Sequence, residues 1–245
     1  APAPEPSQPS AKKEPASPSG SGATTAANTG QGATDKPKAK GPFPESDHAA
    51  MKDPSLAKDQ APEKFTVKFD TTAGEFNVEC TREWAPNGVD RFYNLVKIGF
   101  FNDVSLFRAV KGFVVQFGIH GNPEVSAKWR DAQLPKDDVK GTNSRGMLTY
   151  AMAGSPDTRT TQLFFNLNDN SRLDGMGFSP ICKVIDDGMS VVDKIHMGYG
   201  ERPSKAQGTI QTQGNKYLRE TYPELDYIKT VTLVGDDAAG AASAS

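Results

Sequence analysis

Short apolar segments interrupted by turn residues are the feature that most limits how this chain can fold. Residues 65–70 and 75–80 alternate apolar and polar side chains on either side of residues 71–74, a pattern that predicts a β-hairpin. Several further short strands are expected between about residues 104 and 185, separated by turns that contain Gly, Asn and Pro. Many short strands with few helices favour a β-barrel or a β-sandwich over a fold of alternating strands and helices.

Helical periodicity is confined to a few segments. One amphipathic helix is predicted after residues 85–88, where apolar side chains recur at helical spacing: Val89, Phe92, Tyr93 and Val96. A second helix is expected near residues 189–197. The long connection of residues 198–225 has room for a short helix at about residues 208–219 but has no predicted role. The last strand is expected at residues 228–233.

Apolar residues are unevenly distributed along the 245 residues, and this predicts one folded domain between two tails. Residues 1–61 are dominated by Ala, Pro, Ser, Gly, Lys and Gln and contain a single aromatic residue, Phe43. Such a segment buries too little apolar surface to offset the conformational entropy lost on ordering. We therefore expect residues 1–62 to be a disordered tail or linker, residues 63–234 to form the domain, and residues 235–245 to be a second disordered tail.

The sequence argues against nucleic-acid binding and a membrane span. A net charge of −2 at pH 7 predicts nothing about partners. The lysines of the N-terminal segment are diluted by acidic residues and lack aromatic partners, so nucleic acid is not expected to bind. No run of about 18 apolar residues occurs, so no transmembrane span is expected. The chain begins with Ala1 rather than Met, which fits a removed secretion signal or a shortened sequence. We expect an exported monomer, periplasmic or extracellular and tethered by its N-terminal segment, with a cytoplasmic protein as the alternative.

Residues with metal-binding or nucleophilic chemistry are few. Two cysteines, Cys80 and Cys182, allow one disulfide or two small buried apolar side chains, and the sequence leaves both open. The three histidines are scattered without cysteines or carboxylates at ligand spacing, which argues against a zinc site. No Gly-x-Ser-x-Gly motif is present, so a serine nucleophile of that type is not expected.

An arginine and a glutamine interrupt an otherwise largely apolar, strand-like run at residues 106–118. This run contains a single arginine, Arg108, and a single glutamine, Gln116. A guanidinium at such a position must be paired or must face a cleft, because leaving it buried and unsatisfied is costly in free energy. Taken alone, Arg108 would more often be a surface or salt-bridged residue than a functional one.

Five ordered stretches resemble the sequence blocks of the cyclophilin family of peptidyl-prolyl cis-trans isomerases: residues 106–118, 146–154, 160–166, 171–175 and 183–195. The resemblance covers about residues 63–234. It implies a mainly β fold, in which eight antiparallel strands form a closed β-barrel capped by two α-helices, with the active groove on one outer face. It also implies an enzyme that needs no cofactor, accelerates rotation about Xaa-Pro bonds of proline-containing polypeptides, and assists protein folding.

Rotation about an Xaa-Pro bond is slow because resonance gives the C–N bond partial double-bond character, with a barrier of about 18–20 kcal/mol. A hydrogen bond to the prolyl nitrogen favours the twisted amide over both planar forms, since the nitrogen lone pair becomes available only when resonance is lost. The resemblance gives this catalytic role to Arg108, a permanent cation with several N–H donors, and places Gln116 beside it.

The same resemblance implies a substrate-binding groove around Arg108. Phe113, Val114, Phe164 and Leu173 form its apolar pocket for the proline ring. Ala151 and Met152 belong to the strand whose backbone pairs with the residue before proline. Gln162 frames the groove, and Phe178 takes the place of the family's groove histidine.

Some positions depart from the family pattern. Val114 replaces a methionine, Met152 replaces an asparagine, and Arg172 replaces the tryptophan that binds the family's cyclic immunosuppressant, which argues against tight binding of that drug. The substitutions at Val114, Arg172 and Phe178 leave an alternative, a proline-peptide binding module or chaperone with little or no turnover. A third interpretation is a carrier with a ligand cavity inside the β-barrel, and the many bulky Phe and Leu side chains oppose it.

Overall fold

The structure, a computed structural model, describes residues 39–235. Most of the two expected tails, residues 1–38 and 236–245, lies outside the described residues.

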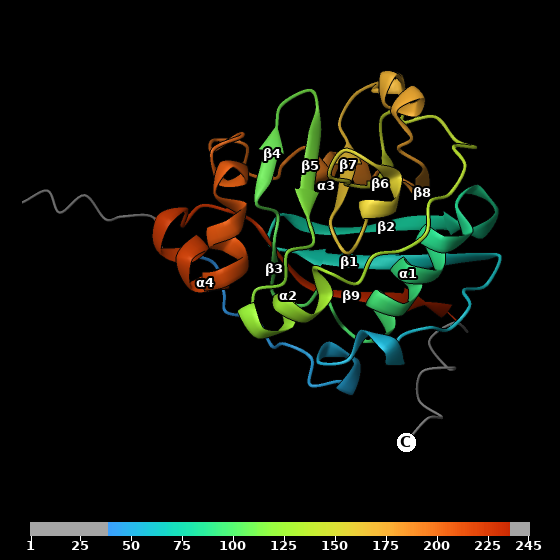
Figure 1. The fold of residues 1–245 in the computed structure, drawn as a ribbon. Helices are drawn as coiled ribbons and strands as arrows, with labels where there is room; N and C mark the ends of the chain where they lie inside the picture. Colours follow the sequence, from blue (N-terminus) through green and yellow to red (C-terminus); the bar gives the residue numbers. More distant parts are fainter. Residues whose placement is uncertain (1–38, 236–245) are drawn as a thin grey trace, which may run out of the picture. The chain divides into compact units, whose positions relative to one another are not determined.

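The described residues form a mainly β fold around one antiparallel sheet (Figure 1). Its nine strands are β1 (Lys64–Thr71), β2 (Gly74–Thr81), β3 (Val104–Ser105), β4 (Arg108–Val110), β5 (Val114–Phe117), β6 (Met147–Tyr150), β7 (Leu163–Asn166), β8 (Pro180–Val184) and β9 (Tyr227–Val234). Their order in the sheet is β3-β9-β1-β2-β8-β6-β7-β5-β4. The expected hairpin is confirmed, because β1 pairs with β2 from Thr71 opposite Gly74 to Lys64 opposite Thr81.

The strand count differs from the expected eight. The chain between Val104 and Val110 pairs as two short strands, β3 with β9 and β4 with β5, and only Leu106 and Phe107 separate them. β3 and β4 are the two edge strands of the sheet, and they do not pair with each other. The hydrogen-bonded strands of the described residues therefore form a curled sheet and not a closed barrel.

The described residues contain four α-helices rather than two: α1 (Pro86–Lys97), α2 (Pro123–Trp129), α3 (Gly188–Val192) and α4 (Gln207–Thr221). The predicted helices correspond to α1, α3 and α4, although α3 ends at Val192 and is shorter than expected. No prediction covered α2. This helix is short, and it begins with Pro123 after Asn122, whose side chain accepts a hydrogen bond from the Glu124 N–H. Such end signals are local, and seven residues are too few to display a helical period.

Aromatic side chains fill the space enclosed by the curled sheet. The Phe69 ring lies 5.1 Å from the Phe76 ring and 5.5 Å from the Phe165 ring, measured between centroids. Phe165 in turn stacks on Phe117 at 5.5 Å. These rings are buried, and their packing contributes aromatic contact energy as well as apolar burial. A ligand-carrier interpretation would need a cavity in this space, and the packed rings oppose it.

Residues 39–62 were expected to belong to the disordered tail, and the structure contradicts this. They contain two 3-10 turns, Ala49–Met51 and Pro54–Leu56, and Ala50 and Met51 are buried. The Trp129 Nε1–H of α2 donates to the Ala50 carbonyl at 3.1 Å, which ties this segment to the domain. A few anchoring contacts to residues far along the chain thus hold a segment whose composition resembles that of a linker.

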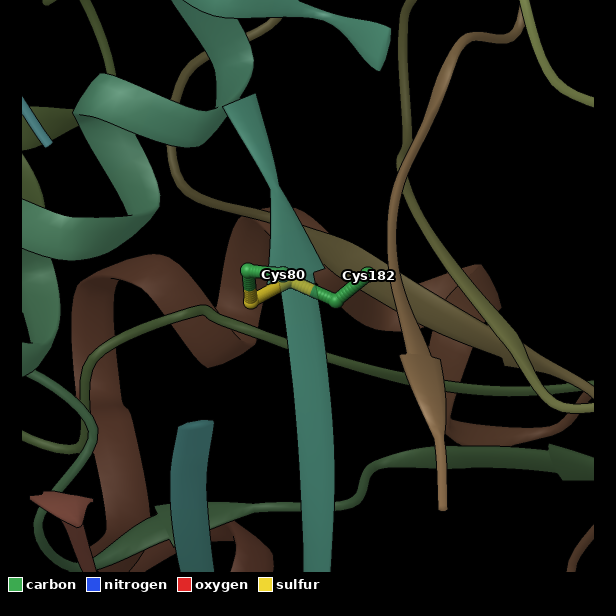
Figure 2. The surroundings of a disulfide bond; sticks show 2 residues. All are labelled: Cys80 and Cys182. Atoms are coloured by element: carbon green, nitrogen blue, oxygen red, sulfur yellow. A yellow bond between two sulfur atoms is a disulfide. The ribbon is translucent and has the colours of Figure 1, made fainter. Parts of the chain in front are cut away.

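The two cysteines form a disulfide that links neighbouring strands (Figure 2). Cys80 of β2 stands opposite Cys182 of β8 in the ladder, and both side chains are fully buried. The disulfide interpretation of the sequence is therefore confirmed, and the interpretation as two separate apolar side chains is wrong.

Candidate active site

Strand register places the expected catalytic residues in one row. Arg108 of β4 stands directly opposite Gln116 of β5, and Gln116 stands opposite Phe164 of β7. Side chains of directly paired residues project from the same face of a sheet. Arg108, Gln116 and Phe164 therefore lie side by side on one face, although they come from three strands.

The row borders a cavity of about 220 Å³, and every expected site residue except Gln162 lines this cavity. The lining residues are Arg108, Phe113, Val114, Gln116, Ala151, Met152, Phe164, Leu173, Phe178 and Gln207. Gln162 lines an adjacent cavity of about 320 Å³, which shares Gln116, Ala151 and Met152 with the first. The structure thus brings all of the residues named by the family resemblance to one place.

The floor of the smaller cavity is apolar. Val114, Phe164 and Leu173 form a buried cluster, with Phe113, Ala151 and Phe178 packed against it. The Phe178 ring meets the Phe164 ring edge to face, with 5.8 Å between centroids. A pocket of this kind can hold a small apolar ring such as that of proline, and it gains free energy by removing the ring from water.

A tight turn directs Phe178 toward the cavity. Gly177 ends the 3-10 helix Ser171–Met176 with a φ of 90°, a conformation that glycine adopts without steric cost. The Phe178 N–H then donates to the Leu173 carbonyl at 3.3 Å, which keeps both side chains near each other.

A directed row of hydrogen bonds forms the polar wall of the two cavities. Arg108 Nη1 donates to Gln116 Oε1 at 2.9 Å, Gln116 Nε2 donates to Gln162 Oε1 at 2.9 Å, and Gln162 Nε2 donates to Gln207 Oε1 at 3.1 Å. A guanidinium has donors but no acceptor, so Gln116 must present its oxygen to Arg108. That choice sets the orientation of each following amide in turn. We call Arg108, Gln116, Gln162 and Gln207 the donor row.

Arg108 also carries a carboxylate partner that the sequence did not reveal. Its Nε donates to Glu201 Oε2 at 2.9 Å and its Nη2 donates to Glu201 Oε1 at 2.6 Å. The side chains are 22% exposed for Arg108 and 47% exposed for Glu201, so the pair lies at the rim of the cavity and not beneath the surface. These hydrogen bonds from Arg108 lower the pKa of the Glu201 carboxyl, which is therefore ionised at neutral pH.

Sequence reasoning also missed Gln207. Glu201 and Gln207 both come from the connection of residues 198–225, which had no predicted role. The requirement that Arg108 be paired or face a cleft was the only signal that pointed to them. In the structure Arg108 does both, because one edge of its guanidinium is paired and the side chain also lines the cavity.

Arg172, which was expected to replace a tryptophan of the family, is exposed and lies over the Phe113 ring. Its Cζ atom is 4.9 Å from the ring centroid. A cation therefore lies against one of the aromatic rings that line the cavity.

Between residues 39 and 235, no three His, Cys, Asp or Glu side chains come together in a way that could hold a metal ion. In the same part of the chain, no helix has both the length and the apolar character needed to cross a membrane.

Comparison with known proteins identifies the class. Residues 66–215 match the family described as cyclophilin type peptidyl-prolyl cis-trans isomerase. The chain belongs to this family of isomerases.

Individual relatives support the assignment. The chain is 31% identical over 137 residues to peptidyl-prolyl cis-trans isomerase B of Escherichia coli. The matched region covers 53% of this chain and 82% of the relative. It is 32% identical over 136 residues to a peptidyl-prolyl cis-trans isomerase of Acinetobacter baylyi, covering 53% of this chain and 70% of that protein. A cyclophilin-type isomerase from Cryptosporidium parvum has a similar fold, with a TM-score of 0.51, 18% identity, and coverage of 71% of this chain and 99% of that one.

Proposed function

We propose that this chain accelerates rotation about Xaa-Pro peptide bonds of polypeptides, with Arg108 as the donor to the prolyl nitrogen. The observation that carries the proposal is the position of the Arg108 guanidinium at the edge of a cavity of about 220 Å³ that has an apolar floor. The proline ring enters this cavity and is held there, while the part of the peptide before proline turns about the C–N bond.

The chemistry requires no covalent intermediate. In the planar amide the nitrogen lone pair is delocalised and accepts hydrogen bonds poorly, and it becomes an acceptor when the bond twists. A donor fixed beside that nitrogen therefore binds the twisted state more strongly than either planar state, which lowers the barrier. Each ~1.4 kcal/mol of such differential binding gives about a tenfold higher rate.

The remaining expected residues have supporting roles in this proposal. Gln116 holds one N–H of Arg108 and so orients it, as the 2.9 Å hydrogen bond supports. The backbone of Ala151 and Met152 pairs with the residue before proline, and Gln162 frames the groove beside them. Phe113, Val114, Phe164, Leu173 and Phe178 surround the proline ring.

We also propose that the sheet closes into a barrel. We treat β3 and β4 as two halves of one bent strand, because the Leu106 N–H between them donates to the Asp226 carbonyl at 2.9 Å, adjacent to β9. Counted in this way, eight strands surround the phenylalanine core as a closed barrel. The isomerase domain of residues 63–234 then carries residues 39–62 as an ordered extension.

Place of action is part of the same proposal. We place the protein outside the cytoplasm, as a monomer that assists the folding of exported, proline-containing polypeptides. The disulfide between Cys80 and Cys182 supports this, because stable disulfides form mainly in oxidising compartments.

Exchange NMR on a short peptide that contains one Ala-Pro bond tests the activity directly. With the protein far below the peptide concentration, we expect cross-peaks between the cis and trans signals that are absent from the peptide alone. Shifted peptide signals without exchange cross-peaks would contradict catalysis and support the alternative, a binding module for proline-containing peptides.

A further inference from the structure

The connection of residues 198–225 is attached to the strand that carries Arg108. Gly200 forms an antiparallel β-bridge with Ala109 of β4, the residue next to Arg108. This bridge brings the following residue, Glu201, beside the Arg108 guanidinium. Farther along, α4 begins at Gln207 and lies beside α2 and β3 (Figure 1).

Buried contacts fix this connection to the domain, so it is not a loose lid. Asn215 Nδ2 donates to the Asp103 carbonyl at 2.5 Å, and Arg219 Nη2 donates to Asp103 Oδ1 at 2.5 Å. Ile210 and Leu218 of α4 are buried in a cluster with Phe107. Residues held in this way can impose a position on the groups they contact.

Close backbone packing adds to this attachment. The Asn215 N–H donates to the Gly121 carbonyl at 2.9 Å. A Cβ atom on Gly214 would lie 1.9 Å from the Gly121 oxygen, so only glycine permits this approach. Gly214 has a non-helical backbone with a φ of 59°, so α4 is kinked there, and the kink packs against the loop before α2.

Glu201 restricts the guanidinium more than Gln116 can. An arginine side chain has several rotatable bonds and loses much conformational freedom when it is held in one position. Gln116 engages one N–H of Arg108, while Glu201 engages two along one edge, and this fork geometry fixes the plane of the guanidinium. With three of its five N–H groups engaged, Arg108 keeps two for a substrate.

The same connection holds the other end of the donor row. Gln207 Oε1 accepts from Gln162 Nε2 at 3.1 Å, and Gln207 also lines both cavities. The row of hydrogen bonds is therefore held at both ends by this connection. Glu201 pairs with Arg108 at one end, and Gln207 accepts from Gln162 at the other.

We propose that Glu201 and Gln207 are positioning residues of the isomerase reaction, which keep the donor row oriented so that the two remaining N–H groups of Arg108 stay available to the prolyl nitrogen. This inference rests on the proposed function. It assigns the connection of residues 198–225 to the active site and gives each of the two residues a defined partner.

The test measures kcat and KM separately by exchange NMR for the wild-type protein, Glu201→Gln, Gln207→Ala and Glu220→Gln. Glu220 is exposed on α4, so its replacement removes the same charge from the same connection. We expect Glu201→Gln to lower kcat about tenfold and Gln207→Ala to lower it about threefold, with KM changed by less than about twofold, because a donor out of place affects the transition state most. Glu220→Gln should match the wild type.

A spectroscopic readout separates positioning from general damage. In the wild-type protein we expect a resolved Arg108 Nε–H signal that shifts and broadens in Glu201→Gln, while the thermal unfolding midpoint stays unchanged. If Glu201→Gln has the wild-type kcat, or a higher kcat because Glu201 obstructs Arg108, the inference is wrong although the isomerase function stands. If the wild-type protein itself does not accelerate exchange, the proposed function fails first and the inference with it.

Discussion

Two arginine–carboxylate pairs in this protein use the same chemistry in opposite surroundings. Arg108 and Glu201 form their pair at the cavity rim, with side chains 22% and 47% exposed. Arg159 and Asp137 form theirs in the interior, with side chains 1% and 2% exposed. Burial and the number of unused donors therefore decide whether such a pair maintains the fold or remains available to a substrate.

The interior pair is occupied by the protein itself. Arg159 Nη1 donates to Asp137 Oδ2 at 3.1 Å, Nε donates to the Pro156 carbonyl at 2.7 Å, and Nη2 donates to the Pro135 carbonyl. Asp137 also accepts from the backbone N–H groups of Asn87 and Gly88 in the first turn of α1. Each nitrogen of this guanidinium therefore holds a loop or a helix end in place.

The largest expected effect is on stability and comes from breaking the interior pair. Arg159→Met should lower the free energy of unfolding by about 3–5 kcal/mol, because it leaves the Asp137 carboxylate buried without its cation. Urea denaturation measures the loss. Arg145→Met is the matched control, since Arg145 pairs with Asp193 while both side chains are more than two-fifths exposed, and it should cost less than about 1 kcal/mol. A loss in Arg159→Met no greater than in the control would contradict the comparison.

The rim pair should show the reverse pattern. Arg108→Ala should lower kcat/KM about a hundredfold to a thousandfold, or ~3–4 kcal/mol of transition-state stabilisation, as for the loss of a preorganised donor. The free energy of unfolding should change by less than about 1 kcal/mol, because the pair is partly exposed. Exchange NMR and urea denaturation measure the two quantities on the same preparation.

Two further variants test the specificity of this result. Arg108→Lys keeps the charge but loses the planar fork, so it should remain far below the wild type in kcat/KM. Lys111→Ala removes an exposed cation from the β4–β5 turn and should match the wild type. Equal losses of activity and stability in Arg108→Ala would mean that Arg108, like Arg159, is structural.

The disulfide provides a stabilising link outside both pairs. Cys80 and Cys182 are 102 residues apart in the sequence, so the bond closes a long loop in the unfolded chain. Replacing both by alanine should lower the free energy of unfolding by about 3 kcal/mol, with kcat/KM unchanged because neither residue lines the cavity. An unchanged urea midpoint, or a loss of activity by the folded variant, would contradict this expectation.

How far the sequence predicts these features depends on how local their causes are. The β1–β2 hairpin follows from alternation within a few residues, and the cavity residues follow from motifs that the family shares. Glu201 lies 93 residues from Arg108 in the sequence, and no local pattern links the two. The same reason explains why the packing of residues 39–62 was not foreseen, because Ala50 meets Trp129 only in the folded chain.

The donor row shows the same division within one site. Gln116 and Gln162 occupy family positions and were predicted, whereas Gln207 belongs to a connection whose helix was expected but whose contacts were not. A helical period states which side of a helix is apolar, but it does not state what that side packs against. The contacts of α4 with Asp103 and Gly121 depend on the whole fold.

The smallest of these effects concerns an ionisable group outside both pairs, His120. Its side chain is buried, and burial lowers its pKa to about 4. In the unfolded chain the pKa of histidine is about 6.5, so between these values the unfolded state binds more protons than the folded state. Stability should therefore fall as the pH falls through this window, by about 2 kcal/mol between pH 7 and pH 5.

Urea midpoints measured across that pH range test the assignment of this loss to His120. In His120→Gln the decrease between pH 7 and pH 5 should largely disappear, whatever the variant costs in stability at pH 7. In His48→Gln, where the replaced side chain is exposed, the decrease should persist. If the wild type and His120→Gln lose the same stability over this range, His120 does not cause the pH dependence. The difference between buried and exposed ionisable groups would then hold for the arginine pairs but not for this histidine.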